Sequence, residues 1–230
     1  MKKIVVFTGA GVSAESGINT FRDSGGLWEQ HKIEDVATPE AFRKDPVLVL
    51  DFYNQRRKQV LQAQPNAAHL AIVKLEEKFE VNVITQNIDD LHERAGSSKV
   101  LHLHGEILKA RSSVDPSLIY LVIDGEINIG QKCERGSQLR PFIVWFGEQV
   151  PAMEKAIMLT SDADIFIVIG TSLEVYPAAN LVDYAKIEIT KYLVDPNAKS
   201  MPHINNLKII NSNAGIGVPG LISKLLNDEH

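Results

Sequence analysis

The chain is poor in cysteine and contains no long apolar run. Cys133 is the only cysteine among 230 residues, which excludes an internal disulfide framework and is typical of the reducing cytosol. No stretch approaches the length of a membrane-spanning helix, and the apolar run at residues 4–7, behind Lys2 and Lys3, is far too short for the core of a secretory signal. We therefore expect a cytoplasmic protein with no membrane partner.

An excess of positive charge is lacking as well. The 24 Lys and Arg residues are outnumbered by 29 Asp and Glu residues, so the net charge is −5. This balance disfavours a general binder of nucleic acid or of anionic membranes. With 44% hydrophobic and 23% charged residues, the composition is that of an ordinary globular protein, long enough for one sizeable core with or without a small added domain.

Short apolar runs alternate with helical patterns along the chain. Runs typical of buried strands lie at residues 4–7, 81–85, 142–146, 165–170 and 207–210, with a weaker one at 191–194. Helical patterns cover residues 46–62, 66–79, 151–163 and 218–226. Continuous apolar runs favour a parallel sheet covered on both faces, so the alternation predicts an α/β fold with a Rossmann-like parallel sheet.

The segment 107–140 breaks this alternation. It carries turn pairs at 115–116 and 124–125 and an apolar run at 117–123, with little helical periodicity. We predict a small inserted subdomain at 107–140, with a Rossmann-like part formed by residues 1–106 and 141–230 of a single unit spanning 1–230. Whether part of the helices at 30–65 joins the subdomain stays open.

A glycine-rich loop follows the first apolar run. It contains Gly9 and Gly11, but Ala14 occupies the third position of a G-x-G-x-x-G pattern, and no Gly-Lys-Ser/Thr follows. Such a loop exposes backbone N–H groups that suit a pyrophosphate, although a turn of purely structural use looks the same. Arg22 either adds a charge-assisted contact to a phosphate or pairs with Asp23 at the surface.

The segment "TQNIDDLHERAG" begins where a predicted strand ends. Gln86, Asn87 and Asp89 therefore emerge at the carboxyl edge of the sheet, where ligand sites of α/β proteins lie. Their amide and carboxylate groups can orient a carboxamide and ribose hydroxyls. The alternative is a helix cap, in which Asn87 or Asp89 opens a short helix that ends at Gly96.

Two histidines follow in "VLHLHGE". His102 and His104 lie two positions apart and share a face if the segment is extended. An imidazole is a natural general base near neutral pH. The alternatives are a pair of metal ligands, or a histidine satisfied within the core.

Two later runs end in polar, glycine-containing turns, "RPFIVWFGEQVP" and "GTSLEVYPAAN". Gly170, Thr171 and Ser172 can receive a further part of a nucleotide. An ordinary strand-to-helix turn, with Pro177 starting the helix, is the alternative.

Taken in succession, "GAGVSAESGINTFRDSGGLW", "TQNIDDLHERAG", "LHLHG", "RPFIVWFGE" and "GTSLEVYPAA" resemble the sirtuins, which are NAD-dependent protein-lysine deacylases. The resemblance runs from residue 4 to about residue 226. It implies a Rossmann-like NAD domain with a small insertion, NAD as the cofactor, and acyl-lysine protein substrates laid between the two parts. We expect a monomer.

The resemblance also implies a set of binding residues. The first loop and Arg22 hold the phosphates and ribose of NAD, and residues 23–28 belong to a mobile cofactor loop. Gln86 and Asn87 meet the nicotinamide ribose, and Asp89 meets the carboxamide. The implied cofactor set is Gly9, Ala10, Gly11, Ala14, Phe21, Arg22, Trp28, Gln86, Asn87, Ile88, Asp89, Gly170, Thr171, Ser172 and Ala214. The strand ends implied to clamp the peptide contribute Val144, Phe146, Gly147, Glu148, Leu173 and Val175.

The family chemistry needs few protein groups. The acyl oxygen attacks the ribose carbon that carries nicotinamide, and a base then removes a ribose hydroxyl proton so that the acyl group migrates. The resemblance makes His104 that base and Asn87 the second catalytic residue. The implied products are free lysine, nicotinamide and O-acyl-ADP-ribose.

Tyr53 and Arg56 resemble the Tyr-x-x-Arg pair of class III sirtuins, which receive acidic acyl groups. A phenol and a guanidinium suit the carboxylate of succinyl- or malonyl-lysine, with acetyl-lysine as a further substrate. Ala37 matches the small residue that widens this pocket. The alternative is a solvated basic helix face, which accounts for Arg57 and Lys58 better than for Tyr53.

The chain departs from the family pattern in the small subdomain. Sirtuins usually carry two Cys-x-x-Cys pairs that hold zinc, whereas the matching positions here are Ser112, Asp115, Cys133 and Gly136. One thiolate does not make a four-ligand zinc site, so we predict no metal. We expect the apolar run at 118–123 to be buried and to stabilise the subdomain instead.

Two alternatives of other classes stay open, namely a non-catalytic sensor of NAD or ADP-ribose and an NAD hydrolase or ADP-ribosyltransferase. The intact "QNID" and His104 argue against a sensor. An oxidoreductase is disfavoured because the sequence has no G-x-G-x-x-G and no recognisable hydride-acceptor site.

Overall fold

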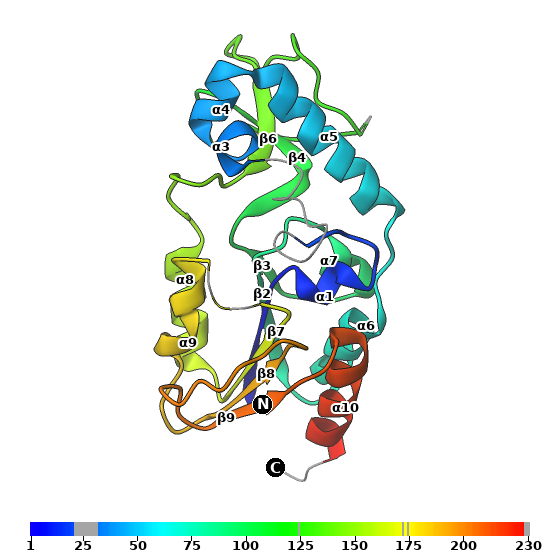
Figure 1. The fold of residues 1–230 in the computed structure, drawn as a ribbon, viewed down its shortest axis with the longest axis vertical. Coiled ribbons are helices and arrows are strands. Elements are labelled where there is room, and N and C mark those ends of the chain that lie inside the picture. The colour runs from blue at the N-terminus through cyan, green and yellow to red at the C-terminus, as the bar shows by residue number, and fades with distance from the viewer. Residues whose placement is uncertain (21–31, 124, 172, 174, 228–230) are drawn as a thin grey trace.

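The computed structural model describes residues 1–20, 32–123, 125–171, 173 and 175–227. Within these residues a six-stranded parallel sheet has the order β3-β2-β1-β7-β8-β9 and forms the lower part of Figure 1. Its strands are β1 Lys3–Thr8, β2 Glu80–Thr85, β3 Val100–His102, β7 Ile165–Ile169, β8 Thr190–Val194 and β9 Leu207–Ile210. The predicted α/β class with a Rossmann-like parallel sheet is confirmed.

Helices cover both faces of this sheet. Ile4 and Val6 of β1 lie in one core with residues of α6 and α10, whereas Val5 and Phe7 lie in the other with residues of α8 and α9. Successive strand residues point to opposite faces, so a strand with helices on both sides is apolar throughout. The covering helices are α6 Ala67–Lys74, α10 Ala214–Asn227, α8 Met153–Asp162 and α9 Leu181–Tyr184.

Short helical turns complete the large sheet unit. They are α1 Gly11–Ala14, η1 Leu75–Glu77, α7 Leu91–Ala95 and η2 Ala178–Asn180. The helix predicted at 66–79 thus ends at Lys74 and continues as the turn η1, and the one predicted at 218–226 begins earlier, at Ala214.

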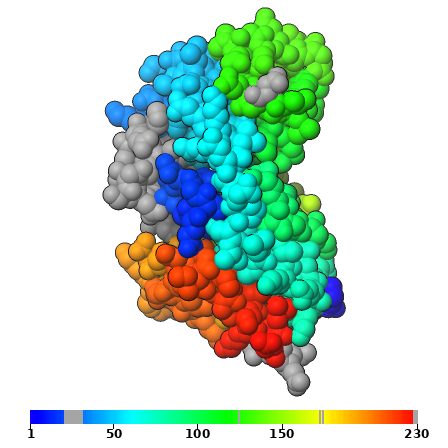
Figure 2. Space-filling view, turned by 90° about the vertical axis from the view of Figure 1, so that its right-hand side faces the viewer, coloured from blue at the N-terminus to red at the C-terminus, as the bar shows by residue number. Residues whose placement is uncertain are grey.

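A second, antiparallel sheet of three strands lies beside helices at the top of Figure 1, in the order β5-β4-β6. Figure 2 shows this part, in cyan and green, as an upper lobe above the parallel-sheet core. Its elements are β4 Gly105–Ser112, β5 Ile119–Leu121, β6 Leu139–Ile143, α3 Ile33–Val36, α4 Pro39–Lys44 and α5 Pro46–Gln62. The sheet extends from residue 105 to residue 143, slightly beyond the predicted 107–140 at both ends.

The prediction that residues 142–146 form a strand of the parallel sheet is wrong. Residues 142 and 143 end β6 of the antiparallel sheet, and the chain then leaves regular structure. Ile143 and Trp145 are buried against α3 and α5, while Phe146 between the two lobes is exposed. An apolar run reports that side chains are buried, and it does not say which strand or helix buries them.

The prediction that residues 118–123 form a buried core is also wrong. Ile119, Leu121 and Ile123 are 45%, 71% and 90% exposed. The first two lie on β5, which is an edge strand of the small sheet, and Ile123 lies in the turn that follows it. The small core consists instead of Leu50, Ala110 and Ile127, with Val122 partly buried beside them.

Arg57 ties α5 to the small sheet from within. Its side chain is 0% exposed, its Nε donates to the Ile107 carbonyl at 2.7 Å, and its Nη1 donates to Asn54 Oδ1 at 2.7 Å. Asn54 Nδ2 in turn donates to the carbonyl of Ile127 at 3.0 Å. A solvated basic helix face is therefore the wrong description of Arg57, although it fits Lys58, which is exposed and lies 2.8 Å from Glu126. Part of the helices at 30–65 packs on the small sheet, as the sequence left open.

Among the helices that the structure describes, none is both long enough and apolar enough to cross a membrane.

Candidate active site

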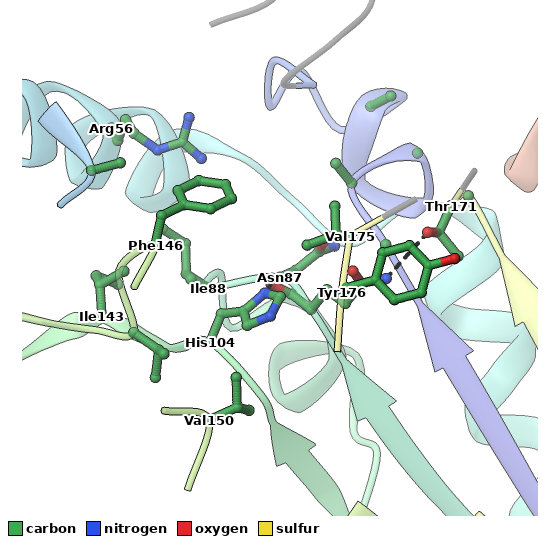
Figure 3. Close-up of a pocket in the computed structure, with 18 of the residues that line it drawn as sticks. Arg56, Asn87, Ile88, His104, Ile143, Phe146, Val150, Thr171, Val175 and Tyr176 are labelled. Atoms are coloured by element: carbon green, nitrogen blue, oxygen red, sulfur yellow. Dashed lines mark hydrogen bonds between the residues drawn. The ribbon is translucent and has the colours of Figure 1, made fainter. Parts of the chain in front are cut away.

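A cavity of about 520 Å³ lies where the two lobes meet, at the carboxyl ends of the parallel strands. Both lobes contribute to it, and Figure 3 shows Arg56 entering from α5 and His104 from the segment after β3. The predicted residues that line it are Gly9, Ala10, Gly11, Ala14, Ala37, Tyr53, Arg56, Gln86, Asn87, Ile88, His104, Val144, Phe146, Gly147, Glu148, Gly170, Thr171, Val175 and Ala214. The fold thus brings most of the predicted set into one place.

Other predicted residues lie elsewhere. Asp89 is buried just behind the cavity wall, and Leu173 packs against the core that faces α8 and α9. The predictions for Phe21, Arg22, Trp28, Ser172 and the loop at residues 23–28 fall outside the described residues.

The first glycine-rich loop is packed directly against the loop after β7. Gly9 N donates to the Ile169 carbonyl at 3.0 Å, and Gly11 N donates to the Gly170 carbonyl at 2.9 Å. A Cβ on Gly9 would lie 2.6 Å from Thr171 Cβ, and one on Gly11 would lie 2.7 Å from Gly170 Cα. Both glycines are therefore required by the close approach of two backbones, which also leaves backbone lining the cavity floor.

Asn87 and Asp89 meet through one serine hydroxyl. Asn87 Nδ2 donates to Ser13 Oγ at 3.1 Å, and Ser13 Oγ donates to Asp89 Oδ2 at 3.1 Å. Burial raises the pKa of Asp89, and the hydrogen bonds from Leu91 N and Ser13, which lower it, offset only part of this effect. This chain of donors uses the amide nitrogen of Asn87 and leaves its Oδ1 as the atom that can accept from a ligand.

Asp89 also has the capping role that the sequence left as an alternative. Its Oδ1 accepts from Leu91 N at 3.2 Å at the start of α7. Nearer the cavity, Gln86 Nε2 donates to Thr171 Oγ1 at 3.2 Å and links the loops after β2 and β7 (Figure 3).

His104 has the geometry of a general base. Its Nδ1 lies 3.1 Å from the Gln86 carbonyl, which can only accept, so Nδ1 carries the hydrogen and Nε2 holds a lone pair. Burial lowers the pKa of His104, partly offset by the Gln86 carbonyl, so the ring is neutral at pH 7.

His102 differs from His104 both in the hydrogen bonds of its ring nitrogens and in the direction of its pKa shift. Its Nδ1 lies 2.9 Å from the Asn87 carbonyl and its Nε2 lies 2.7 Å from Glu93 Oε1, so both nitrogens donate. Burial alone would lower the pKa of His102, but the hydrogen bond and charge of Glu93 outweigh burial and raise it. His102 is therefore a protonated partner of Glu93 rather than a proton acceptor.

Tyr53 and Arg56 lie together at the α5 side of the cavity. Their side chains are only 4% and 5% exposed, so neither belongs to a solvated helix face. Burial raises the pKa of Tyr53 to about 12 and lowers that of Arg56 to about 10, so at pH 7 the phenol is protonated and the guanidinium is charged. Ala37 and Ile88 lie in the same wall.

The carboxylate of Glu148 is occupied by hydrogen bonds within the protein. Its oxygens accept from Arg140 at 2.7 and 3.0 Å, from Arg111 at 3.0 Å and from Trp145 N at 2.8 Å. The carboxylate thus holds the segment after β6 in place.

Sequence reasoning missed several residues of the cavity wall. The sequence indicates β8 only as a weak strand, yet the carboxyl-edge rule applied to the end of that strand points to Asp195. The missed lining residues are Glu15, Phe52, Ile143, Trp145, Val150, Tyr176, Pro177, Val194, Asp195, Pro196, Asn197 and Asn213. The aromatic and aliphatic members among them are ordinary core types, which carry no signal of a site.

The positions that match the zinc cysteines do not fit a zinc ion. The Cys133 thiol donates to Ser112 Oγ at 3.3 Å and lies 3.1 Å from Ser137 Oγ, and these hydroxyls lower its pKa to about 7. Asp115 accepts from Ser117 and pairs with Arg135 at 2.9 Å. Among the described residues, no group of three or more His, Cys, Asp or Glu could hold a metal ion. A hydroxyl and thiol cluster occupies the place of the metal.

Comparisons with known proteins agree on one family. A sequence model of the Sir2 family matches residues 9–177. An NAD-dependent protein deacylase of Helicobacter pylori is 51% identical over 226 residues, covering 98% of this chain and 96% of that protein. An NAD-dependent protein deacylase of Bacteroides thetaiotaomicron is 50% identical over 231 residues, covering 98% and 99%.

Solved structures match over the same length. A mutant Sir2 homologue in complex with ADP-ribose is 38% identical with a TM-score of 0.90, covering 100% of this chain and 95% of that one. A complex of a Sir2 homolog with NAD is 40% identical with a TM-score of 0.88, covering 98% and 90%.

Proposed function

The chain belongs to the Sir2 family and is an NAD-dependent protein deacylase, and we propose that it removes succinyl and malonyl groups, as well as acetyl groups, from protein lysines. The proposed products are free lysine, nicotinamide and O-acyl-ADP-ribose. The observation that carries the proposal is the buried pair of Tyr53 and Arg56 in the cavity that also contains His104.

A charged guanidinium inside a cavity selects an anionic ligand. Arg56 remains charged at pH 7 although it is almost fully buried, and a buried cation is stabilised by an opposite charge far more than an exposed one is. Tyr53 supplies a protonated hydroxyl beside it. A terminal carboxylate of an acyl group can accept from both, whereas an acetyl group offers neither a charge nor an acceptor at that depth.

The opposite side of the cavity suits NAD. Gly9, Gly11 and Gly170 present bare backbone to the cavity. Gln86, Thr171 and Ala214 line the same cavity. When bound, NAD supplies the ribose carbon that receives the acyl oxygen, with nicotinamide as the leaving group. This placement is supported by the fact that most of the residues predicted from the sequence to bind NAD line this one cavity.

The chain's own residues then have defined tasks. Asn87 is oriented by Ser13, so that its Oδ1 can accept from a ribose hydroxyl. His104, fixed by the Gln86 carbonyl, presents Nε2 as the proton acceptor that acyl migration requires. The residues Val144, Phe146, Gly147 and Val175 form the proposed peptide channel between the lobes.

We propose further that one chain suffices, because a single chain supplies every described wall of the cavity. The single cysteine and the net charge of −5 support a cytoplasmic enzyme without nucleic-acid partners. The small lobe at 107–140, with α3–α5 packed on it, is proposed to work as one catalytic unit with the rest of 1–230.

The test is a mass-spectrometric screen of succinyl-, malonyl- and acetyl-lysine peptides with NAD. We expect all three to be deacylated, with formation of the matching O-acyl-ADP-ribose. Arg56→Met should lower kcat/KM for succinyl-lysine about ten- to a hundredfold, since a bidentate charged contact contributes about 1.5–3 kcal/mol, and should change deacetylation less than threefold. Lys58→Met, which removes an exposed cation from the same helix, is the matched control.

Equal losses on the succinyl and acetyl substrates would contradict the acidic acyl pocket. Release of free ADP-ribose with no change of the lysine would instead indicate NAD hydrolysis, and transfer of ADP-ribose to the peptide would indicate an ADP-ribosyltransferase.

A further inference from the structure

Trp145 lies in the wall of the cavity beside Tyr53, at a position to which the proposed function gives no role. Its side chain is 3% exposed and lies in the core cluster formed with α3 and α5. Its indole Nε1 donates to the Tyr53 hydroxyl oxygen at 3.0 Å, and the two rings lie 6.3 Å apart with an interplanar angle of 40°.

The direction of this hydrogen bond is fixed by chemistry. An indole N–H is only a donor, so the oxygen of Tyr53 must be the acceptor. The hydroxyl hydrogen of Tyr53 must then point away from Trp145. Among the described residues, Trp145 is the only hydrogen-bond partner of that hydroxyl, so its hydrogen is available to an acceptor inside the cavity.

We propose that Trp145 is a positioning residue for acidic acyl groups, which aims the hydroxyl hydrogen of Tyr53 at the acyl carboxylate. The proposal rests on the proposed function, in which that carboxylate lies between Tyr53 and Arg56. An ionised carboxylate only accepts hydrogen bonds, so it needs the donor end of the phenol. A hydroxyl that already accepts from an N–H is also a stronger donor, because successive hydrogen bonds polarise one another.

The indole is itself held in a fixed orientation. The guanidinium carbon of Arg140 lies 3.3 Å from the centroid of the Trp145 ring, and the ring of Phe42 lies 5.4 Å away. Glu148 accepts from Arg140 through both oxygens and also from the backbone N of Trp145. Glu148 therefore fixes both the guanidinium of Arg140, which stacks on the indole, and the backbone of Trp145.

The competing explanation is that Trp145 only fills space in the core. A core-filling role predicts equal losses on every substrate when the side chain is reduced. A role through the Tyr53 hydroxyl predicts a loss confined to acidic acyl groups, and one that disappears when that hydroxyl is absent.

The experiment is a double-mutant cycle with Trp145→Phe and Tyr53→Phe. The measured quantity is kcat/KM for succinyl-lysine divided by kcat/KM for acetyl-lysine, with kcat and KM determined separately. This ratio does not depend on the fraction of enzyme that is folded, so partial destabilisation by the smaller side chain cancels. Trp145→Met, which also lacks the N–H but adapts its shape, is the second variant in case the first does not fold.

We expect Trp145→Phe and Trp145→Met each to lower the ratio about three- to tenfold, the scale of one neutral hydrogen bond. The change should appear in KM for succinyl-lysine, since the carboxylate end of the acyl group takes no part in bond making. In the Tyr53→Phe background the same substitutions should change the ratio less than about twofold, since the hydroxyl through which Trp145 acts is then absent.

An equal fall of the ratio in both backgrounds would overturn the inference, because Trp145 would then act without the hydroxyl. An unchanged ratio in the Trp145 variants would overturn it as well. Loss of the proposed function has a different signature, in which Tyr53→Phe and Arg56→Met both leave the ratio unchanged.

Discussion

Replacing His104 by Ala should reduce kcat/KM by about two to four powers of ten, which corresponds to about 2.7–5.5 kcal/mol of transition-state stabilisation. The size follows from the geometry of the ring, which is half-buried, held by the Gln86 carbonyl at 3.1 Å and neutral at pH 7. Binding of NAD should largely survive, because the loops at Gly9 and Gly170 do not depend on this side chain.

The pH profile identifies which histidine is the base. A base works in its neutral form, so kcat/KM falls as the pH drops through its pKa. Burial places the pKa of His104 below 6.5, whereas Glu93 raises that of His102 above 6.5. If His104 is the base, activity persists below pH 6.5, and if His102 were, it would already decline above that pH.

The assay is kcat/KM between pH 5 and pH 9 with an acetyl-lysine peptide, whose acyl group does not titrate in this range. His102→Gln, which keeps a donor for the Asn87 carbonyl, is the control and should cost less than about tenfold, the scale of one hydrogen bond. An acid limb centred above pH 6.5, or a greater loss in His102→Gln than in His104→Ala, would refute the assignment of the base.

The packing leads to three further predictions. Gly9→Ala should weaken NAD binding by about tenfold or more in calorimetry, since the added Cβ would lie 2.6 Å from a neighbouring side chain. Gly220→Ala is the control, because a Cβ at that position would meet nothing within 4 Å. It should leave NAD binding unchanged and stabilise α10 by up to about 1 kcal/mol. Purified protein should contain no stoichiometric zinc and keep its activity after chelation, and Cys133→Ser should cost about 1 kcal/mol or less in urea unfolding; loss of activity with the chelator would contradict this. Ile123→Asp should be tolerated within about 0.5 kcal/mol, whereas Ile127→Asp should destabilise by more than about 3 kcal/mol, and similar values for the two would show that the small core is misassigned.

The sequence predicted the large sheet well because its signal is local and redundant. Each strand buried on two faces must be apolar along its whole length, as in β1 and β7, and the carboxyl-edge rule then places Asn87, Gly170 and Thr171 at one site. The proposed acyl pocket depends at the sequence level on the resemblance alone, since helical spacing places Tyr53 and Arg56 together but does not say whether they face solvent or a cavity.

The errors arose where a property depends on partners far along the chain. Residues 118–123 and 142–146 are equally apolar, yet one is an exposed edge and the other lies between the lobes, because an apolar run does not identify its neighbours. Arg57 has the composition of a surface residue and is fully buried, because its Nε donates to the carbonyl of Ile107, about fifty residues away in sequence. No local pattern encodes these contacts.

The hydrogen bond of Arg57 fixes the spacing between two walls of the cavity, α5 and the segment that leads into β4. Arg57 is bound to the carbonyl of Ile107 in β4, and β4 begins at Gly105, the residue directly after His104. Arg56 is the next residue to Arg57, so the position of its backbone relative to the base is set by a few residues of strand and one buried hydrogen bond. In the proposed acyl pocket this spacing selects acyl groups by length, because an acyl group either spans the interval between His104 and Arg56 or leaves its carboxylate short of the guanidinium.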